Sequence, residues 1–287
     1  LEAFSNMDLD ISLDIAELRY LQDSLTNLVL RIEQQDGALD VQQLSYKAPR
    51  GNVTAALSIN PSRANAANVK MDFNAEDFIF NLAGAADDKL DQTPLFDIDF
   101  HASGNGANLQ EVAGSLNGSF YVASKGGNAE NVDLSILETF IFDQIFSVLM
   151  PKTDKSLSTK FSCIAARAEI VNGLLTTSPA IAFTTDKIAV NTQGTIDLKT
   201  EQMNFNFNST PTNALKINAG ELFHPFILIS GTLTDPKVGV DPGKSALHGG
   251  AAIATLGLSV LAKGVVDRAG ALNPLCDEML NDPPKRK

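Results

Sequence analysis

Apolar and polar residues alternate strictly along several segments of the chain. From Met7 to Ile15 every odd position is apolar and every even position is polar, and the same pattern recurs at 71–74, 96–100 and 203–208. Successive side chains of a β-strand point to opposite faces of a sheet, so each segment has one apolar and one polar face. Dipeptides typical of turns lie between such segments, at Asp36-Gly37, Asn60-Pro61, Asn117-Gly118, Asn172-Gly173 and Asp235-Pro236. The pattern predicts an antiparallel β meander.

Two segments depart from this alternation and carry apolar residues at helical spacing. Residues 132–150 are apolar around most of the expected helix surface and are followed by Pro151, which predicts a helix that ends there. Residues 244–271 are rich in Ala and Gly. Because so much Gly makes an isolated helix unstable, we expect this second helix to pack on another element.

These patterns divide the chain into three parts. Residues 1–100 are an N-terminal β repeat segment, residues 101–242 are a second β segment that contains the first helix, and residues 243–287 are an Ala/Gly-rich helical tail. A strand, an Asx-Gly turn, a strand and a further strand occur at 32–59 and again at 170–198. Such repetition suggests an extended β structure, although any two antiparallel meanders would share this order.

The apolar faces of these strands need a cover. A sheet that is apolar on one face must bury that face against another layer. One solution is a closed or sandwiched core, and another is an open groove that lipid fills. The alternation of apolar and polar residues fits both solutions and does not choose between them.

Composition and charge exclude several classes of protein. The chain has 287 residues, a net charge of -12, sixteen Phe and no Trp. The negative charge argues against a nucleic-acid partner, because binding phosphates needs a basic surface. The longest apolar stretch, 249–262, ends at Lys263, which is too short to span a bilayer. Since alternation begins within the first residues, we expect no signal peptide and interpret the chain as a soluble fragment whose upstream targeting segment has been removed.

Candidate catalytic and metal-binding patterns are weak. His101, His224 and His248 are far apart and have no Cys or carboxylate at ligand spacing, so we expect no metal site. The segment 239–245 is one residue short of a phosphate-binding loop, and 104–109 ends in Leu where a dinucleotide loop has Gly. No G-x-S-x-G motif is present in the sequence. We therefore expect no catalytic residues, no cofactor and no enzymatic activity.

The two cysteines, Cys163 and Cys276, are 113 positions apart. They are either joined in a disulfide that closes a long loop or are two buried free thiols that act as small apolar side chains. The residues alone leave both possibilities open.

A series of short motifs follows in a fixed order between Leu109 and Val238. The motifs are L-x-x-V-A-G-S-L-N-G at 109–118, N-V-D-L at 131–134, T-K-F at 159–161, I-V-N-G-L-L at 170–175, G-T-I-D-L at 194–198, M-N-F at 203–205 and I-S-G-T-L-T-D-P-K-V at 229–238. In this order they resemble the C-terminal region of the AsmA family of bacterial envelope proteins, and residues 1–100 resemble the repeat that precedes it in the family.

The resemblance implies a mainly β fold, namely an extended, curved antiparallel sheet that forms an open groove, with one or two short helices. It implies a periplasmic protein that is anchored to the bacterial inner membrane by a segment upstream of this chain. It also implies that the apolar lining of the groove carries phospholipid acyl chains and supports outer-membrane biogenesis. Some relatives place a Cys at both positions, so the resemblance favours a disulfide between Cys163 and Cys276.

The resemblance and the alternation together lead to two hypotheses. In the first, phospholipid lies along apolar lining residues, for which the expected set is Leu9, Ile11, Leu13, Phe73, Phe96, Ile98, Phe100, Phe205 and Phe207. Each of these residues would fit an ordinary dry core equally well. In the second, the chain is a scaffold or assembly factor that pairs an exposed strand edge with outer-membrane or other envelope proteins.

Overall fold

The computed structural model describes residues 8–20, 23–62, 66–79, 93–128, 160–185, 188–212, 226–240 and 274–283. The strands are β1 Leu9–Tyr20, β2 Asp23–Gln35, β3 Ala38–Lys47, β4 Asn52–Pro61, β5 Ala67–Phe78, β6 Phe96–Gly106, β7 Asn117–Ser124, β8 Gly127–Asn128, β9 Lys160–Val171, β10 Leu174–Thr185, β11 Ile188–Asp197, β12 Gln202–Pro211, β13 Phe226–Thr232 and β14 Pro236–Val240. The helices are α1 Leu109–Ser115 and α5 Pro274–Asn281.

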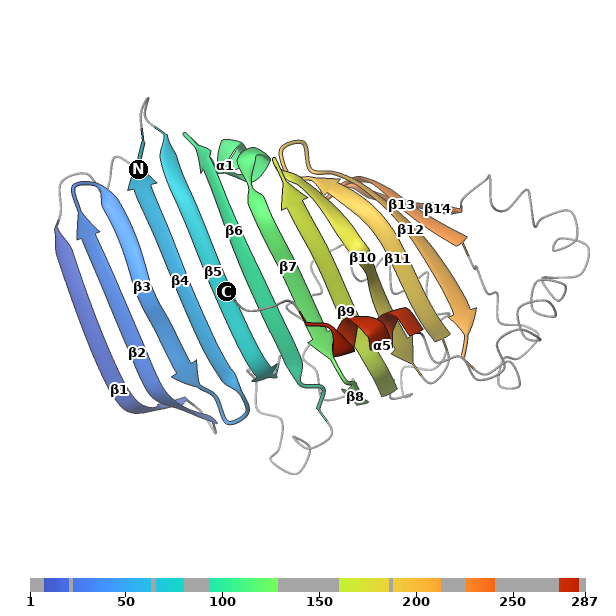
Figure 1. Ribbon diagram of the computed structural model, residues 1–287, viewed down its shortest axis with the longest axis horizontal. Coiled ribbons are helices and arrows are strands. Elements are labelled where there is room, and N and C mark those ends of the chain that lie inside the picture. The colour runs from blue at the N-terminus through green and yellow to red at the C-terminus, as the bar shows by residue number, and fades with distance from the viewer. Residues whose placement is uncertain are drawn as a thin grey trace, which may run out of the picture.

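The strands form a single antiparallel sheet (Figure 1). Each strand pairs with the next one along the chain, except that β7 pairs with β9 and the two-residue β8 pairs with β9 off the main path. In the described residues β1 and β14 do not pair with each other, so the sheet is open and not a barrel. At about 4.8 Å between strands, it extends for about 58 Å from β1 to β14. It curves toward the β14 end (Figure 1). The predicted mainly β, open antiparallel fold is confirmed.

The strand register places the alternating residues on two chemically different faces. We call the face with Ile11, Phe73 and Phe205 the inner face, and the face with Asp72 and Asn204 the outer face. One cross-strand row of directly paired residues on the inner face runs through Ile11, Ile32, Val41, Leu57, Met71, Ala102, Gly118, Ile170, Leu175, Ile196, Met203, Gly231 and Pro236. The apolar face is therefore continuous from β1 to β14.

Helix α1 packs on the inner face at one end of β6. The side chain of Asn108 caps the helix by accepting a hydrogen bond from the Glu111 amide, and the Glu111 carboxylate accepts one from the Ala107 amide. Close approach to β6 requires glycine there, because a Cβ on Gly106 would lie 2.5 Å from the backbone nitrogen of Val112. The G-x-G pattern of this segment thus serves helix packing.

Helix α5 packs on the opposite, outer face, over β7, β9 and β10 (Figure 1). Its Cys276 and Met279 are buried in a cluster with Tyr121, Ala123 and Ala165. Small alanine side chains on the outer face leave room for the helix backbone. The described helix at 274–281 lies within the predicted helical tail.

Residue 100, at the expected end of the first β segment, lies within β6, and the sheet continues across it. The helix expected near 132–150 and most of the tail, 243–273, lie outside the described residues.

Candidate functional site

All nine residues expected to line a groove lie on the inner face. Leu13, Phe73 and Phe100 belong to one row of paired residues that runs through Leu13, Leu30, Leu44, Ala55, Phe73, Phe100, Phe120 and Ala168. Ile98 and Phe207 belong to a second row, which runs through Tyr46, Val53, Ala75, Ile98, Val122, Ala166, Ile181, Thr192, Phe207 and Ile227. Neither row contains a charged side chain.

The remaining four residues lie in other rows of the same face. Ile11 is paired with Ile32, and Leu9 is paired with Gln34, a buried residue of β2. Phe205 is paired with Ile229 on β13, and Phe96 is paired with Phe78 at the far end of β6. Tertiary structure therefore brings residues almost 200 positions apart onto a single surface.

Exposure of the inner face changes along the sheet. In the β1–β6 half, Leu9, Ile11, Phe73, Ile98 and Phe100 are only partly buried, and Leu13 is 43% exposed. In the β11–β13 half the corresponding side chains are buried, and Phe205 and Phe207 are each 8% exposed, in a cluster with Val190 and Ile229. Phe96 is also 8% exposed. Six of the nine residues thus present apolar surface, and three are part of a packed core.

The outer face is polar over the same strands. On β5 and β6, His101 lies between two carboxylates, with 2.7 Å from Nδ1 to Asp72 and 3.1 Å from Nε2 to Asp99. Lys70 Nζ lies 3.1 Å from the other oxygen of Asp72. Partial burial raises the pKa of Asp72, but the hydrogen bonds from His101 and Lys70 outweigh it and hold that pKa below its usual value.

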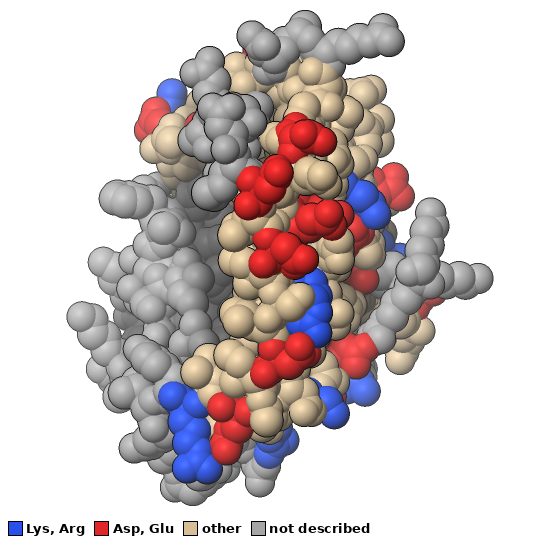
Figure 2. All heavy atoms as spheres, turned by 90° about the vertical axis from the view of Figure 1, so that its left-hand side faces the viewer, with Lys and Arg blue, Asp and Glu red and all other residues tan. Residues whose placement is uncertain are grey.

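Acidic side chains also gather on the side of the molecule where β1 lies (Figure 2). Asp10 and Asp14 on that strand and Asp8 just before it are exposed, and Arg31 of β2 forms an ion pair of 2.7 Å with Asp14. Polar and charged side chains on this face keep it in water, which leaves the inner face as the apolar surface of the molecule.

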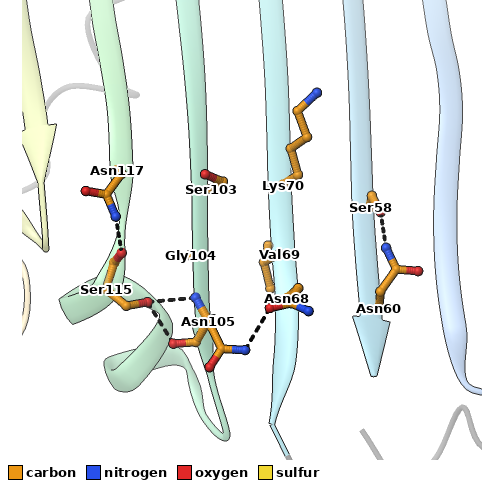
Figure 3. Close-up of a pocket in the computed structure, with 10 residues that line it drawn as sticks. All are labelled: Ser58, Asn60, Asn68, Val69, Lys70, Ser103, Gly104, Asn105, Ser115 and Asn117. Atoms are coloured by element: carbon orange, nitrogen blue, oxygen red, sulfur yellow. Dashed lines mark hydrogen bonds between the residues drawn. The ribbon is translucent and has the colours of Figure 1, made fainter. Parts of the chain in front are cut away.

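A shallow hollow on the outer face is lined by amide and hydroxyl side chains (Figure 3). These groups bind one another: Asn105 Nδ2 donates to Asn68 Oδ1 at 2.9 Å, and Ser115 Oγ donates to the Asn105 carbonyl at 2.7 Å. Asn117 Nδ2 donates to the Ser115 carbonyl at 2.8 Å. The bonds of Asn105, Ser115 and Asn117 therefore join α1 to the ends of β6 and β7, and the polar groups of these three residues are used in that role.

Cys163 of β9 and Cys276 of α5 are joined by a disulfide, which is the pairing that the family resemblance implied. The hydroxyl of Tyr121 donates to the Met279 carbonyl at 3.2 Å, and burial raises the pKa of that phenol. The Arg167 guanidinium lies 5.6 Å above the Tyr121 ring and donates to the Asp282 carbonyl. Sequence reasoning missed this packing of α5, although Ala123 and Ala165 interrupt the polar positions of the outer face.

The described part of the chain offers little for catalysis or metal binding. In these residues no group of three or more His, Cys, Asp or Glu side chains could hold a metal ion. His224 and His248 lie outside the described residues. No described helix has the length and hydropathy needed to cross a bilayer. The apolar inner face is the strongest candidate site in the described chain.

Comparison with known proteins supports the family that the motifs resemble. The sequence profile of the AsmA family matches residues 1–180. The chain belongs to the AsmA family. The AsmA match includes the first hundred residues and ends before the motifs at 194–198 and 229–238, so it extends further toward the N-terminus than the motif series does. No curated protein and no solved structure matches the chain significantly. Membership of the AsmA family is consistent with a role in the bacterial envelope.

Proposed function

We propose that this chain is the periplasmic part of an envelope protein, anchored to the inner membrane, that binds or conducts phospholipid along its inner face and so supports outer-membrane biogenesis. The observation that carries the proposal is the set of uncharged rows through Ile11, Leu13 and Phe73, which remain partly exposed over β1–β6 while the outer face is polar. An exposed apolar face of this size is typical of a ligand or partner surface.

Acyl chains suit this surface because hydrophobic contact is non-directional and needs no matching polar groups. Transfer of each methylene from water to an apolar surface is worth about 0.8 kcal/mol, so a chain of ten methylenes contributes about 8 kcal/mol before its ordering costs. The rows offer no charged partner to a phosphate, and burial of an unpaired charge is costly. The headgroup would therefore stay in water at the margin of the face.

Phe73→Asp tests the proposal at the centre of the accessible half. Phe73 is partly buried and lies between Ala55 and Phe100 in its row, so a carboxylate there interrupts the apolar surface. Thr54→Asp is the matched control, since Thr54 is the exposed outer-face neighbour of Ala55 and gains the same charge. Native mass spectrometry followed by lipid extraction measures phospholipid bound to each purified protein.

We expect bound phospholipid in the natural sequence and in Thr54→Asp, and at least tenfold less in Phe73→Asp. Circular dichroism checks that all three proteins fold. The chain has no Trp, so Tyr fluorescence gives a second readout, with Tyr46 lying in the row of Val53 and Ile98. A lipid-free natural protein, or equal lipid in folded Phe73→Asp, would contradict the proposal.

A second candidate function rests on the edge of the sheet. Among the described residues, β1 is twelve residues long, contains no Pro and pairs only with β2, whereas β14 is five residues long and begins with Pro236. A long unblocked edge can receive another strand. A scaffold for outer-membrane proteins would use this edge, and cross-linking from Ser12 to a polypeptide instead of co-purified lipid would favour it.

A further inference from the structure

The strand at one end of the sheet, β1, pairs with β2 alone among the described strands (Figure 1). A guanidinium nitrogen of Arg31, Nη1, donates to the Leu13 carbonyl at 2.9 Å and to the Leu30 carbonyl at 3.0 Å. Leu13 and Leu30 lie directly opposite each other. One nitrogen can reach both oxygens only when both carbonyls point into the space between β1 and β2, as they do in a hydrogen-bonded antiparallel pair. Leu13 therefore directs its backbone groups toward β2.

Backbone groups that point to the open edge belong to the residues on either side of Leu13. In an antiparallel strand the N–H and C=O groups of successive residues point alternately to the two sides, so those of Ser12 and Asp14 point away from β2. The strand is twelve residues long and contains no Pro, and its register with β2 shows no shift. An edge of this kind can bind another strand through backbone hydrogen bonds.

Apolar side chains are exposed on the same strand. Of the five large apolar side chains that are exposed in the described residues, Leu13 and Leu18 lie on β1, and each is 43% exposed. Leu13 belongs to the inner face, where its paired neighbour Leu30 covers it from one side. A strand added beyond β1 would place a side chain on the other side of Leu13, and an apolar residue there would bury it. The inner-facing positions of such a strand are therefore apolar.

Carboxylates on the outer face of this edge lie in a row without a base. Asp10 of β1 is paired with Glu33 of β2, which is paired with Asp40 of β3. Glu33 accepts a hydrogen bond of 2.9 Å from the neutral amide of Gln42, and Asp10 forms no ion pair with any described residue. Like charges directly opposite each other weaken a strand pair, whereas opposite charges strengthen it. A basic side chain in the next strand, opposite Asp10, would relieve this repulsion.

We infer that the open edge of β1 binds a separate polypeptide in extended conformation, with basic side chains opposite Asp10 and apolar side chains beside Leu13. The strand β2 shows this pattern on the other side of β1, since Arg31 forms an ion pair of 2.7 Å with Asp14 while Leu30 faces Leu13. A second copy of this chain fits the edge less well, because it would bring its own acidic β1 against this one.

This inference goes beyond the lipid-binding function. It rests on the strand-edge pairing of the second candidate function and adds the chemistry of the strand that the edge takes. Backbone groups would supply affinity, and the acidic row would supply specificity by rejecting a strand of like charge.

Two labelled synthetic peptides of about eight residues, a usual strand length, test the inference. In one peptide valine alternates with lysine, and in the other valine alternates with glutamate. Fluorescence anisotropy measures the affinity of the whole chain for each peptide, and we expect the lysine peptide to bind at least tenfold more tightly. Hydrogen exchange followed by NMR should slow at the Ser12 and Asp14 amides when this peptide is bound. Exchange at Leu13, whose amide faces β2, should change little.

Two pairs of variants separate backbone pairing from charge. Ser12→Pro removes an amide that points to the open edge, whereas its control, Ser12→Ala, keeps that amide. Asp10→Asn removes a carboxylate at the edge, and its control, Glu169→Gln, removes an exposed carboxylate on the outer face of β9. We expect affinity for the lysine peptide to fall at least tenfold in Ser12→Pro and about two- to fivefold in Asp10→Asn, with little change in the controls. Circular dichroism checks the fold of each variant.

Equal affinity for the two peptides, unchanged exchange at Ser12 and Asp14, or full binding by folded Ser12→Pro would overturn the inference. A dimer of the natural protein that the lysine peptide does not dissociate would also overturn it, because a second copy would then occupy the edge. If Ser12→Pro does not fold, hydrogen exchange in the natural protein decides the question.

Phospholipid extracted from the natural protein in parallel separates this inference from the lipid-binding proposal. A lipid-free protein that binds the lysine peptide would contradict lipid binding and support the strand partner. A protein that carries phospholipid but does not bind the lysine peptide would support lipid binding and contradict the strand partner.

Discussion

Asp72 and His101 lie directly opposite each other on the outer face of β5 and β6, with 2.7 Å between Oδ1 and Nδ1. One residue along each strand, Phe73 and Phe100 form the equivalent pair on the inner face. Two neighbouring pairs on the same two strands thus carry opposite chemistry. Because successive side chains alternate between polar and apolar, the sheet has one polar face and one apolar face.

The Asp72–His101 pair predicts a pH-dependent contribution to stability. The pKa of Asp72 is lowered in the folded state, so its stabilisation is present above the unfolded pKa and is lost as the pH falls through the folded value. His101→Ala removes one of the hydrogen bonds that lower this pKa, so we expect the Asp72 pKa to rise. Carboxylate chemical shifts measured by NMR across an acid titration report it. An unchanged Asp72 pKa in His101→Ala would count against the pairing.

Because the disulfide joins α5 to β9, we predict that packing of this helix on the outer face requires Cys163. An eight-residue helix is too short to be stable alone, so Cys163→Ser should release α5 from the outer face. By loop entropy, a bond between residues 113 positions apart contributes about 4 to 5 kcal/mol to the free energy of unfolding. Urea denaturation and hydrogen exchange of residues 274–283 measure the two effects. Exchange in 274–283 as slow as in the oxidised natural protein would show that packing alone retains the helix.

Gly106 and Gly239 provide a matched pair of positions for testing how closely α1 packs against β6. A Cβ at Gly106 would lie 2.5 Å from the backbone nitrogen of Val112, whereas a Cβ at Gly239 would meet nothing within 4 Å. Gly106→Ala should therefore lower the free energy of unfolding by about 1 to 3 kcal/mol, as overpacking does, and Gly239→Ala should change it little. Thermal and urea unfolding of both variants check this. Equal destabilisation would mean that α1 does not lie close against β6.

Substitutions at Phe205 and Phe73 should separate effects on the free energy of unfolding from effects on lipid binding. Phe205 is 8% exposed in a packed cluster, so Phe205→Ala is expected to lower the free energy of unfolding by about 3 to 5 kcal/mol. Phe73 is only partly buried, so Phe73→Ala should cost less stability but reduce bound phospholipid. Urea denaturation and lipid extraction measure the two quantities. Loss of lipid in folded Phe205→Ala without loss in Phe73→Ala would contradict this prediction, because it would place the binding surface in the β11–β13 half of the sheet.

The alternation of apolar and polar residues determined where strands form and which face of each strand is apolar. Period-two patterns such as Met7 to Ile15 are local, and they specify both that a strand forms and which of its side chains are apolar. They therefore predicted which side chains of these segments share one face. The Asx-Gly turn at Asn172 and Gly173 was also predicted from the sequence, because these residue types tolerate a positive φ, which is 50° at Asn172.

Only the tertiary structure decided which of these apolar residues remain accessible. Phe73 and Phe205 have the same sequence pattern, yet one is partly exposed and the other is buried. The difference depends on register, on the curvature of the sheet and on contacts between distant strands. The packing of α5 over Ala165, and the choice of an open sheet over a sandwich, depend on the same long-range contacts. Sequence alone thus determined which face of each strand is apolar, and tertiary structure determined which part of that face can meet a ligand.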